Sequence, residues 1–348
     1  MPLQFPHAEP PAPGTTIEVA PGVRWLRMLL PFALDHINLW LLDDELDGVP
    51  GYTIIDCGLA NDGTRENWEK VFAAHLAGKP VHRVIVTHYH PDHAGNAGWL
   101  TERFGCPMWM TQGEYLTAHA VMDGTAGYSP GAAIALYKAN GLSDTHDEGL
   151  AQRGHFYRKV VGPLPDRYRR ILDGERIVIG RHEWGVMTGN GHAPEHVSLY
   201  CAGLGVCISG DMLLPKISTN VSVWSVDPDG DPLSQFLVSI GSYLKLPPAT
   251  LVLPSHGLPF RGAQERVAAL EQHHAERLAE LEQALAAASG PLTAYDVLGT
   301  LFRRKLDTHQ TTFAMGEAIA HLHYLRFAGR AVRVVGADGI VRYAPAAR

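Results

Sequence analysis

The stretch VIVTHYHPDHAGNAGWL, residues 84–100, decides how the rest of the chain is interpreted. Its first four residues are apolar or β-branched, a composition that predicts a short buried strand. Histidines two residues apart at the end of a strand point the same way. We therefore expect His88 and His90, which follow this strand directly, to hold one cation together.

Three more residues of the stretch extend this metal-binding pattern. Pro91 ends the strand, and a tight turn after it swings Asp92 and His93 toward a point a few ångströms away. Imidazole and carboxylate groups suit zinc and similar first-row metals, at roughly 2.0–2.2 Å for zinc. The alternative is a solvated loop that happens to be rich in histidine, which is the false-positive risk of any short motif.

THYHPDHAG resembles the HxHxDH signature of the metallo-β-lactamase superfamily and matches every defined position. The resemblance implies an αββα sandwich whose metals lie at one edge between two sheets. It also implies three further ligands in chain order. These are His192 in GHAPEH (191–196), Asp211 in SGD (209–211) and His256 in PSHG (254–257).

The resemblance implies two divalent metals, with zinc as the default and iron or manganese left open because affinity order and ligand type overlap. By resemblance, Asp211 bridges both metals. The first metal is then bound by His88, His90 and His192, and the second by Asp92, His93 and His256.

The resemblance also implies that two residues near the ligands support them through hydrogen bonds. Asp56 closes the strand-like IIDCGL segment as a D-x-G, for which an ordinary strand-to-helix turn is the alternative. His196 follows His192 by four residues, and a structural surface histidine is an equally good interpretation. His36 and Lys216 are candidates for substrate contact, with ordinary hydrogen bonding as the alternative.

Composition limits the class of protein. The chain has 348 residues, which fits one large domain plus a smaller one, and its 46% hydrophobic and 19% charged content is that of a globular protein. A formal charge of −7 argues against a general binder of nucleic acid or anionic membranes. The four cysteines form no CxxC pair, no signal sequence is recognisable, and no apolar run approaches the roughly 20 residues of a membrane span. We expect a cytoplasmic protein.

The expected fold is mixed α/β, with three consecutive parts. Residues 1–263 form the catalytic sandwich, in which strands and turns alternate from residue 176 to Val226 and residues 112–173 insert a helical cap. Residues 264–290 form a linking helix. Residues 291–348 read as helices followed by a strand, turn and strand, and resemble the winged-helix domain attached to one branch of the superfamily.

That last segment has eight Lys or Arg against four Asp or Glu, so DNA binding is one interpretation. A packing or homodimerising module that also walls the active site is the favoured one, because fold alone does not establish function.

The leading functional prediction, with the substrate class that the resemblance implies, is a dinuclear metal hydrolase that uses a metal-bridging hydroxide on a small ester, thioester or lactone. Asp92 and Asp211 are the expected catalytic residues, with Asp92 both a ligand and a proton shuttle. A phosphodiesterase or ribonuclease is the alternative, disfavoured by the acidic core. A DNA-binding regulator acting through the tail and an oxidative superfamily member are two further alternatives.

One rival motif points to a serine nucleophile. GYSPG (127–131) fits G-x-S-x-G with Ser129 at its centre. A nucleophile elbow needs a strand before the serine, and neither the preceding HAVMDGTA nor the following Pro130 fits one. We expect a turn within the cap.

Overall fold

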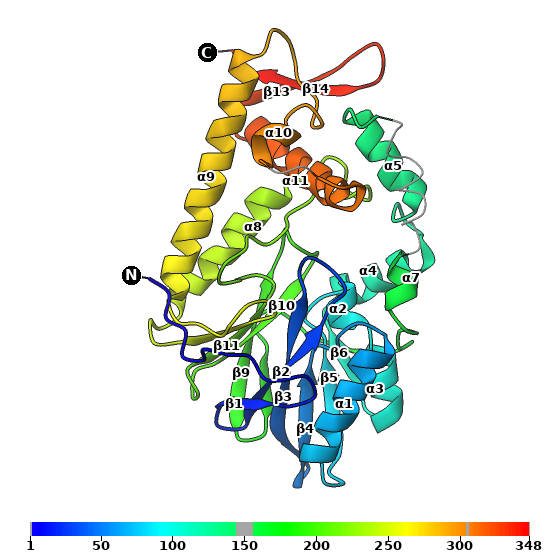
Figure 1. Cartoon of the computed structure of the whole chain (residues 1–348), viewed down its shortest axis with the longest axis vertical. Coiled ribbons are helices and arrows are strands. Elements are labelled where there is room, and N and C mark those ends of the chain that lie inside the picture. Colours follow the sequence, from blue (N-terminus) through cyan, green and yellow to red (C-terminus); the bar gives the residue numbers. More distant parts are fainter. Residues whose placement is uncertain (1, 144–155, 304–305, 348) are drawn as a thin grey trace. The chain divides into compact units, whose positions relative to one another are not determined.

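Two β-sheets lie face to face in the first of two units (Figure 1). The structure is a computed structural model that describes residues 2–143, 156–303 and 306–347. The first unit comprises residues 1–119, 157–219 and 240–267, and the second comprises residues 120–156, 220–239 and 268–348. Part of the predicted cap, residues 144–155, lies outside the described residues.

The larger sheet has seven strands in sequence order and the smaller has five, in the order β12-β11-β10-β9-β8. The seven are β1 (Ile17–Ala20), β2 (Val23–Leu29), β3 (His36–Leu46), β4 (Val49–Ile55), β5 (Val81–Ile85), β6 (Met108–Met110) and β7 (Arg169–Arg170). The five are β8 (Arg176–Ile179), β9 (His182–Gly189), β10 (His196–Cys201), β11 (Val206–Gly210) and β12 (Leu251–Pro254).

The core between the sheets is apolar and draws side chains from both of them. Trp25 and Trp40 of the larger sheet and Trp184 of the smaller are buried there. The indole N–H of Trp25 donates to Asn38 Oδ1 at 2.8 Å, so its polar atom stays satisfied inside the core. Burying each such side chain contributes roughly 1.5–3 kcal/mol, which fixes the two sheets against each other.

Helices cover the outer faces. Trp68 of α1 (Asp62–His75) donates to the Cys57 carbonyl at 2.9 Å, and α3 (Ala97–Phe104) packs on β5. On the other sheet, Tyr243 of the 3-10 helix η2 (Gly241–Lys245) shares a 2.6 Å hydrogen bond with Ser198 of β10. The predicted mixed α/β sandwich is therefore confirmed. This unit also contains α2 (Pro91–Ala94), the first part of α4 (Gln112–Asp123) and nearly all of α7 (Phe156–Val160).

Strand direction brings distant segments to one edge. β4 and β5 run parallel in one sheet, and β11 and β12 run parallel in the other. Parallel neighbours end at the same edge of a sheet, so the residues just after all four strands meet there. The antiparallel β10 begins beside the end of β11, which adds the loop at residues 190–195 to the same edge. The motif residues occupy these strand ends.

The second unit combines the C-terminal segment with two earlier ones. The Val223 N–H donates to the Gly316 carbonyl at 3.1 Å, and the Tyr295 N–H to that of Asn140 at 3.3 Å. The sequence instead predicted consecutive parts, with boundaries at residues 263 and 290. The unit's elements are α5 (Pro130–Ala139), most of α8 (Pro232–Ile240) and of α9 (Ala263–Ala287), α10 (Leu298–Leu301), α11 (Thr308–Phe327), and the hairpin of β13 (Ala331–Val335) and β14 (Val341–Pro345).

Two further outcomes concern this part of the chain. The predicted alternation of strands up to Val226 is wrong, since residues 211–231 form turns and irregular backbone without a strand. The expected strand, turn and strand near the C-terminus is present as the β13–β14 hairpin. The resemblance of residues 291–348 to a winged helix stays a prediction. Among the described residues, every helix is too short or too polar to pass through a lipid bilayer.

Candidate metal centre

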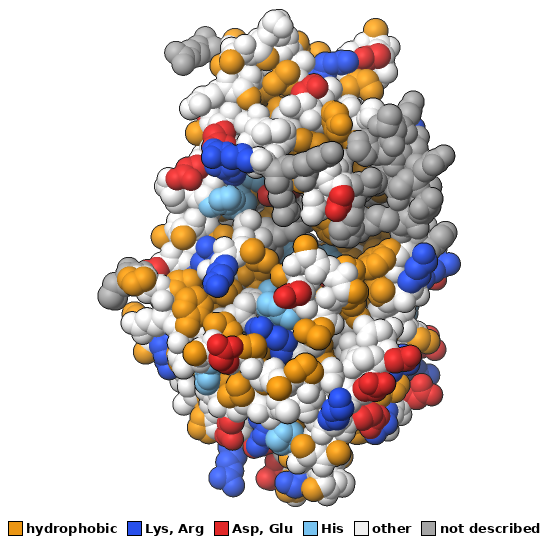
Figure 2. All heavy atoms as spheres, viewed as in Figure 1, with side chains coloured by type: hydrophobic (Ala, Val, Ile, Leu, Met, Phe, Trp, Pro, Cys, Tyr) orange, Lys and Arg blue, Asp and Glu red, His pale blue; other side chains and the backbone are white. Residues whose placement is uncertain are grey.

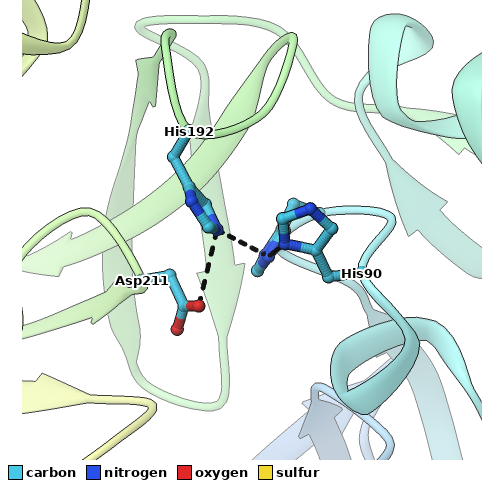
Figure 3. A group of neighbouring side chains, drawn as sticks. His90, His192 and Asp211 are labelled. Carbon is cyan, nitrogen blue, oxygen red and sulfur yellow. Dashed lines mark hydrogen bonds and ion pairs between the residues drawn. The ribbon is translucent and has the colours of Figure 1, made fainter. Parts of the chain in front are cut away.

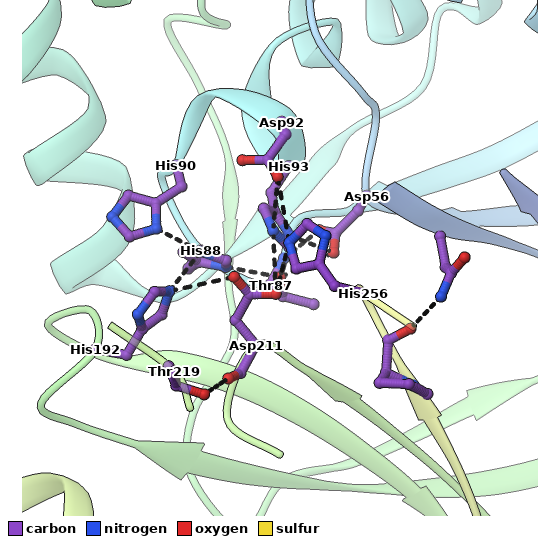
Figure 4. Close-up of polar contacts among 12 residues, drawn as sticks. Asp56, Thr87, His88, His90, Asp92, His93, His192, Asp211, Thr219 and His256 are labelled. Atoms are coloured by element: carbon purple, nitrogen blue, oxygen red, sulfur yellow. Dashed lines mark hydrogen bonds and ion pairs between the residues drawn. The ribbon is translucent and has the colours of Figure 1, made fainter. Parts of the chain in front are cut away.

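The loop after β5 carries four of the seven expected ligands. Pro91 occupies the first turn of α2, where a missing N–H is harmless, and His90 caps that helix in an extended conformation. The His93 N–H then donates to the His90 carbonyl at 3.0 Å. This turn brings His93 and Asp92 around to the side reached by His88 and His90 (Figure 4).

The first ligand group consists of His88, His90, His192 and Asp211, whose ligand atoms lie within 4.8 Å of one another. Nε2 of His88 lies 2.9 Å from Nδ1 of His90 and 3.2 Å from Nε2 of His192. His192 Nε2 in turn lies 3.4 Å from Oδ2 of Asp211, as Figure 3 shows. Three ring nitrogens therefore converge on one point, with a carboxylate oxygen beside them.

The second ligand group consists of Asp92, His93 and His256. Asp92 Oδ2 lies 3.7 Å from Nε2 of His93 and 3.5 Å from Nε2 of His256. The same two nitrogens lie 3.5 and 3.4 Å from Oδ1 of Asp211. One carboxylate thus faces the first group with one oxygen and the second group with the other (Figure 4). The structure brings together all seven side chains that the sequence singled out.

The buried atoms of the second group fit a cation. His93 Nε2, His256 Nε2 and Asp211 Oδ1 are inaccessible to solvent, yet none has a hydrogen-bond partner among the described residues. An unsatisfied buried polar atom costs about 1–3 kcal/mol, and bound metal is a common reason for one. Imidazole nitrogens and carboxylate oxygens are the ligands that zinc, iron and manganese accept.

The two groups differ in protonation. Burial and neighbouring histidines hold the pKa values of His88 and His90 well below the usual value, so both are neutral imidazoles, the form that binds metal. Burial also opposes the charged form of His93, but surrounding carboxylates, led by Asp56, outweigh it and hold the pKa of His93 well above its usual value. Metal binding by the second group therefore has to displace a proton.

Asp56 holds the metal loop from behind. It is fully buried and adopts a left-handed backbone with φ of 62°, which Asp tolerates better than most residues. Its Oδ1 accepts the Thr87 N–H at 2.8 Å, and its Oδ2 accepts the Thr87 hydroxyl at 2.9 Å and the Nδ1–H of His93 at 2.8 Å. Because this hydrogen bond holds one proton on Nδ1, Nε2 is the nitrogen of His93 that can bind a metal once its own proton is displaced.

Two other ligands are oriented in a similar way. The Nδ1–H of His256 donates to the backbone carbonyl of His36 at 2.7 Å, and Nε2 of the His36 ring accepts the Gly257 N–H at 2.8 Å. His196 is fully buried rather than on the surface, and its Nε2 accepts the Asp211 N–H at 3.1 Å. His36 therefore orients a ligand, whereas Lys216 is exposed.

Several residues that hold the candidate ligands in place were not predicted from the sequence. Thr87 hydrogen-bonds Asp56, and Glu114 accepts backbone N–H groups from two ligand-bearing loops. A threonine at a strand end and a glutamate at a helix start carry no spacing pattern that would identify them.

Ser129 caps α5 by accepting the Ala132 N–H at 3.2 Å, and no strand precedes it, which matches the expected turn.

Comparison with known proteins gives consistent matches. The family described as "Metallo-beta-lactamase superfamily" matches residues 35–256, and "Metallo-beta-lactamase-like, C-terminal domain" matches residues 278–346. The crystal structure of a beta-lactamase domain protein from Burkholderia ambifaria superposes with a TM-score of 0.91 at 49% sequence identity, covering 99% of this chain and 98% of that one.

Two curated proteins are also similar in sequence. The probable metallo-hydrolase YqjP of Bacillus subtilis is 24% identical over 306 residues, which cover 86% of this chain and 91% of that protein. A hydroxyacylglutathione hydrolase of Idiomarina loihiensis is 22% identical over 182 residues, which cover 51% of this chain and 48% of that protein.

Proposed function

Because this chain belongs to the metallo-beta-lactamase superfamily, we propose that it is a hydrolase that uses two divalent cations, zinc by default, on a small ester, thioester or lactone. The position of Asp211 is the observation that supports this most directly. Its two oxygens face different ligand groups, 3.4 Å from His192 on one side and 3.4 Å from His256 on the other. The seven nitrogen and oxygen ligands then suffice for two cations that share one carboxylate.

Two bound divalent cations lower the pKa of water and stabilise a developing oxyanion, so hydrolysis needs no serine or cysteine nucleophile. The side chains of this site hold the geometry and move the proton. Asp92 has the more exposed carboxylate of the two in the cluster, 17% against 11% for Asp211. It is therefore the better placed to pass a proton to the leaving group or to solvent. His196 holds Asp211 through its backbone and so fixes the angle of the shared carboxylate.

The proposed substrate class draws on two other observations. One relative is named for hydrolysing hydroxyacylglutathione, which is an acyl thioester. The chain has a formal charge of −7, and on the face in Figure 2 Lys and Arg side chains are scattered among acidic ones rather than gathered in one patch. Polyanionic substrates such as RNA favour concentrated Lys and Arg, so a small acyl substrate fits better.

Metal analysis and a substrate panel test the proposal. The purified protein should carry or take up close to two equivalents of zinc and hydrolyse at least one of a series of thioesters, lactones, esters and β-lactams. His90→Ala and Asp211→Ala should abolish turnover with the fold retained, whereas His182→Ala, outside the cluster, should leave it unchanged. Turnover retained in either ligand variant, or activity confined to phosphodiesters or RNA, would contradict the proposal.

A further inference from the structure

Glu114 lies in the first turn of α4, and its carboxylate is completely buried. Oε2 accepts the backbone N–H of Tyr89 at 2.9 Å, and Oε1 accepts that of Glu195 at 2.7 Å. Tyr89 stands between the ligands His88 and His90, whereas Glu195 belongs to the loop that begins with His192. One side chain therefore joins the two loops that supply all three histidines of the first ligand group.

Other contacts hold the same junction from both sides. The Gly113 N–H donates to the Glu195 carboxylate at 2.9 Å, and the Thr111 hydroxyl donates to the Glu195 carbonyl at 2.8 Å. The Tyr157 hydroxyl donates to the Tyr89 carbonyl at 2.6 Å. The loop that contains Glu195 is thus bound at the start of α4 at several points, and the loop that contains Tyr89 is held by Glu114 and by Tyr157 of α7. Of these residues, Glu114 is the one that contacts both loops.

Filling space does not by itself account for a carboxylate at the position of Glu114. A buried charge is costly unless it is paired. Burial therefore raises the pKa of Glu114 to about 8, while the hydrogen bonds from the Glu195 and Tyr89 backbone N–H groups lower it. An amide would fill the same space without the charge. Both oxygens of Glu114 accept a backbone N–H, and the ionised carboxylate, with two acceptor oxygens and no donor, meets both at once.

We propose that Glu114 is a positioning residue for the first metal, which sets the separation between the His88–His90 pair and His192. The proposal rests on the metal site of the proposed function. Glutamine is the discriminating substitution, because it keeps the size of the side chain but turns one acceptor into a donor that opposes a backbone N–H. One loop then loses its attachment, and the three ring nitrogens cannot all keep their positions.

The test measures metal binding rather than turnover. Purified wild-type protein and Glu114→Gln are stripped of metal and titrated with Zn²⁺ against a chromophoric chelator. They are also loaded with ¹¹³Cd²⁺ for NMR, since a three-nitrogen and a two-nitrogen position give separate resonances. We expect Glu114→Gln to lose about 10- to 100-fold in affinity at one position, the usual effect of removing a group that orients metal ligands. The resonance of the nitrogen-rich position should be the one that shifts or disappears.

Asp44→Asn is the matched control. Asp44 is also a buried carboxylate of the first unit, and it accepts the Gly180 N–H at 2.7 Å and pairs with Arg83 at 2.9 Å, but it touches no ligand-bearing loop. The Asp44→Asn variant should be less stable than wild type and should bind zinc with unchanged affinity. Equal losses of affinity in both variants would show that Glu114 acts only through stability and would overturn the proposal.

The remaining outcomes are also decisive. Wild-type affinity at both positions in Glu114→Gln overturns the positioning role while the proposed function stands. A wild-type protein that takes up no Zn²⁺ overturns both. If Glu114→Gln does not fold, Glu114→Asp takes its place, because it keeps two acceptor oxygens but is one methylene too short to reach the N–H groups of both loops. It should weaken the same position in the same direction, and unchanged zinc binding in that variant would count against the proposal.

Discussion

Replacing Asp56 with asparagine tests whether this buried carboxylate holds the loop after β5 and orients His93. Asparagine keeps one acceptor oxygen for the Thr87 N–H, but its amide nitrogen then faces the Thr87 hydroxyl and Nδ1 of His93. Asparagine also tolerates the left-handed backbone that Asp56 adopts, so the substitution adds little backbone strain. The effect should therefore come from the lost carboxylate alone.

The size of the effect follows from the contacts. The substitution removes two hydrogen bonds to a charged acceptor, each of which contributes about 1.5–3 kcal/mol when buried. Part of this free energy is recovered, because the Thr87 hydroxyl can rotate and accept a hydrogen bond from the new amide. We expect the free energy of unfolding to fall by about 3 kcal/mol. His93 also loses the partner that fixes its proton on Nδ1, so zinc affinity at the second ligand group should fall about 10- to 100-fold.

Urea unfolding in the presence of a chelator measures the first quantity. Tryptophan fluorescence reports on the first unit, which contains Asp56, because Trp25, Trp40 and Trp184 are buried in the core of that unit. Asp47→Asn is the control, because Asp47 has a similar φ of 52° but is exposed and far from the ligands in sequence. If Asp56→Asn stays within about 0.5 kcal/mol of wild type and binds zinc as tightly, the role assigned to this carboxylate is wrong.

Three other outcomes are expected. Gly210→Ala should lower stability and weaken zinc binding, since a Cβ there would lie 2.3 Å from Nε2 of His196 and the residue has a φ of 55°; unchanged zinc affinity would contradict this. Burial lowers the pKa of His274 to about 3 and that of His321 to about 4. Between about pH 4 and 6.5 these two histidines are therefore protonated in the unfolded chain but neutral in the folded one. Stability should therefore fall from pH 7 to pH 5 by about 2 kcal/mol per histidine, and His321→Gln should show a smaller drop in its urea midpoint over that range. Ser129→Ala should cost about 1 kcal/mol through loss of a helix cap but leave hydrolysis intact, and abolished hydrolysis would restore the serine-nucleophile alternative.

The sequence could identify the seven side chains that cluster in the structure, because their pattern is local. His88, His90, Asp92 and His93 occupy six residues after a clear strand, and the later ligands also follow strand-like runs. Residue type and strand ends are both visible in a sequence. The family resemblance then supplied their order, and strand direction brings them to one edge of the sandwich.

The supporting contacts could not be predicted in the same way. Glu114 binds backbone N–H groups, and His256 is oriented by the backbone carbonyl of His36, 220 residues away. Every residue has backbone N–H or carbonyl groups, so a contact with a backbone group does not require a particular residue type and produces no recognisable sequence pattern. The composition of the second unit was missed for a related reason, because the contacts of Val223 with Gly316 and of Tyr295 with Asn140 join segments that are far apart in the chain.

The seven candidate ligands are divided between two sheets, and this has a consequence for biosynthesis. The loop after β5 offers four of them early in translation, whereas His192, Asp211 and His256 come from the smaller sheet and are available only later. Under the proposed function, a nascent chain therefore presents only a partial chelator, and tight capture of an ion waits until the sandwich has closed. Uptake of metal would then mark the end of maturation, and a chain released in metal-starved medium should unfold faster than one released with zinc present.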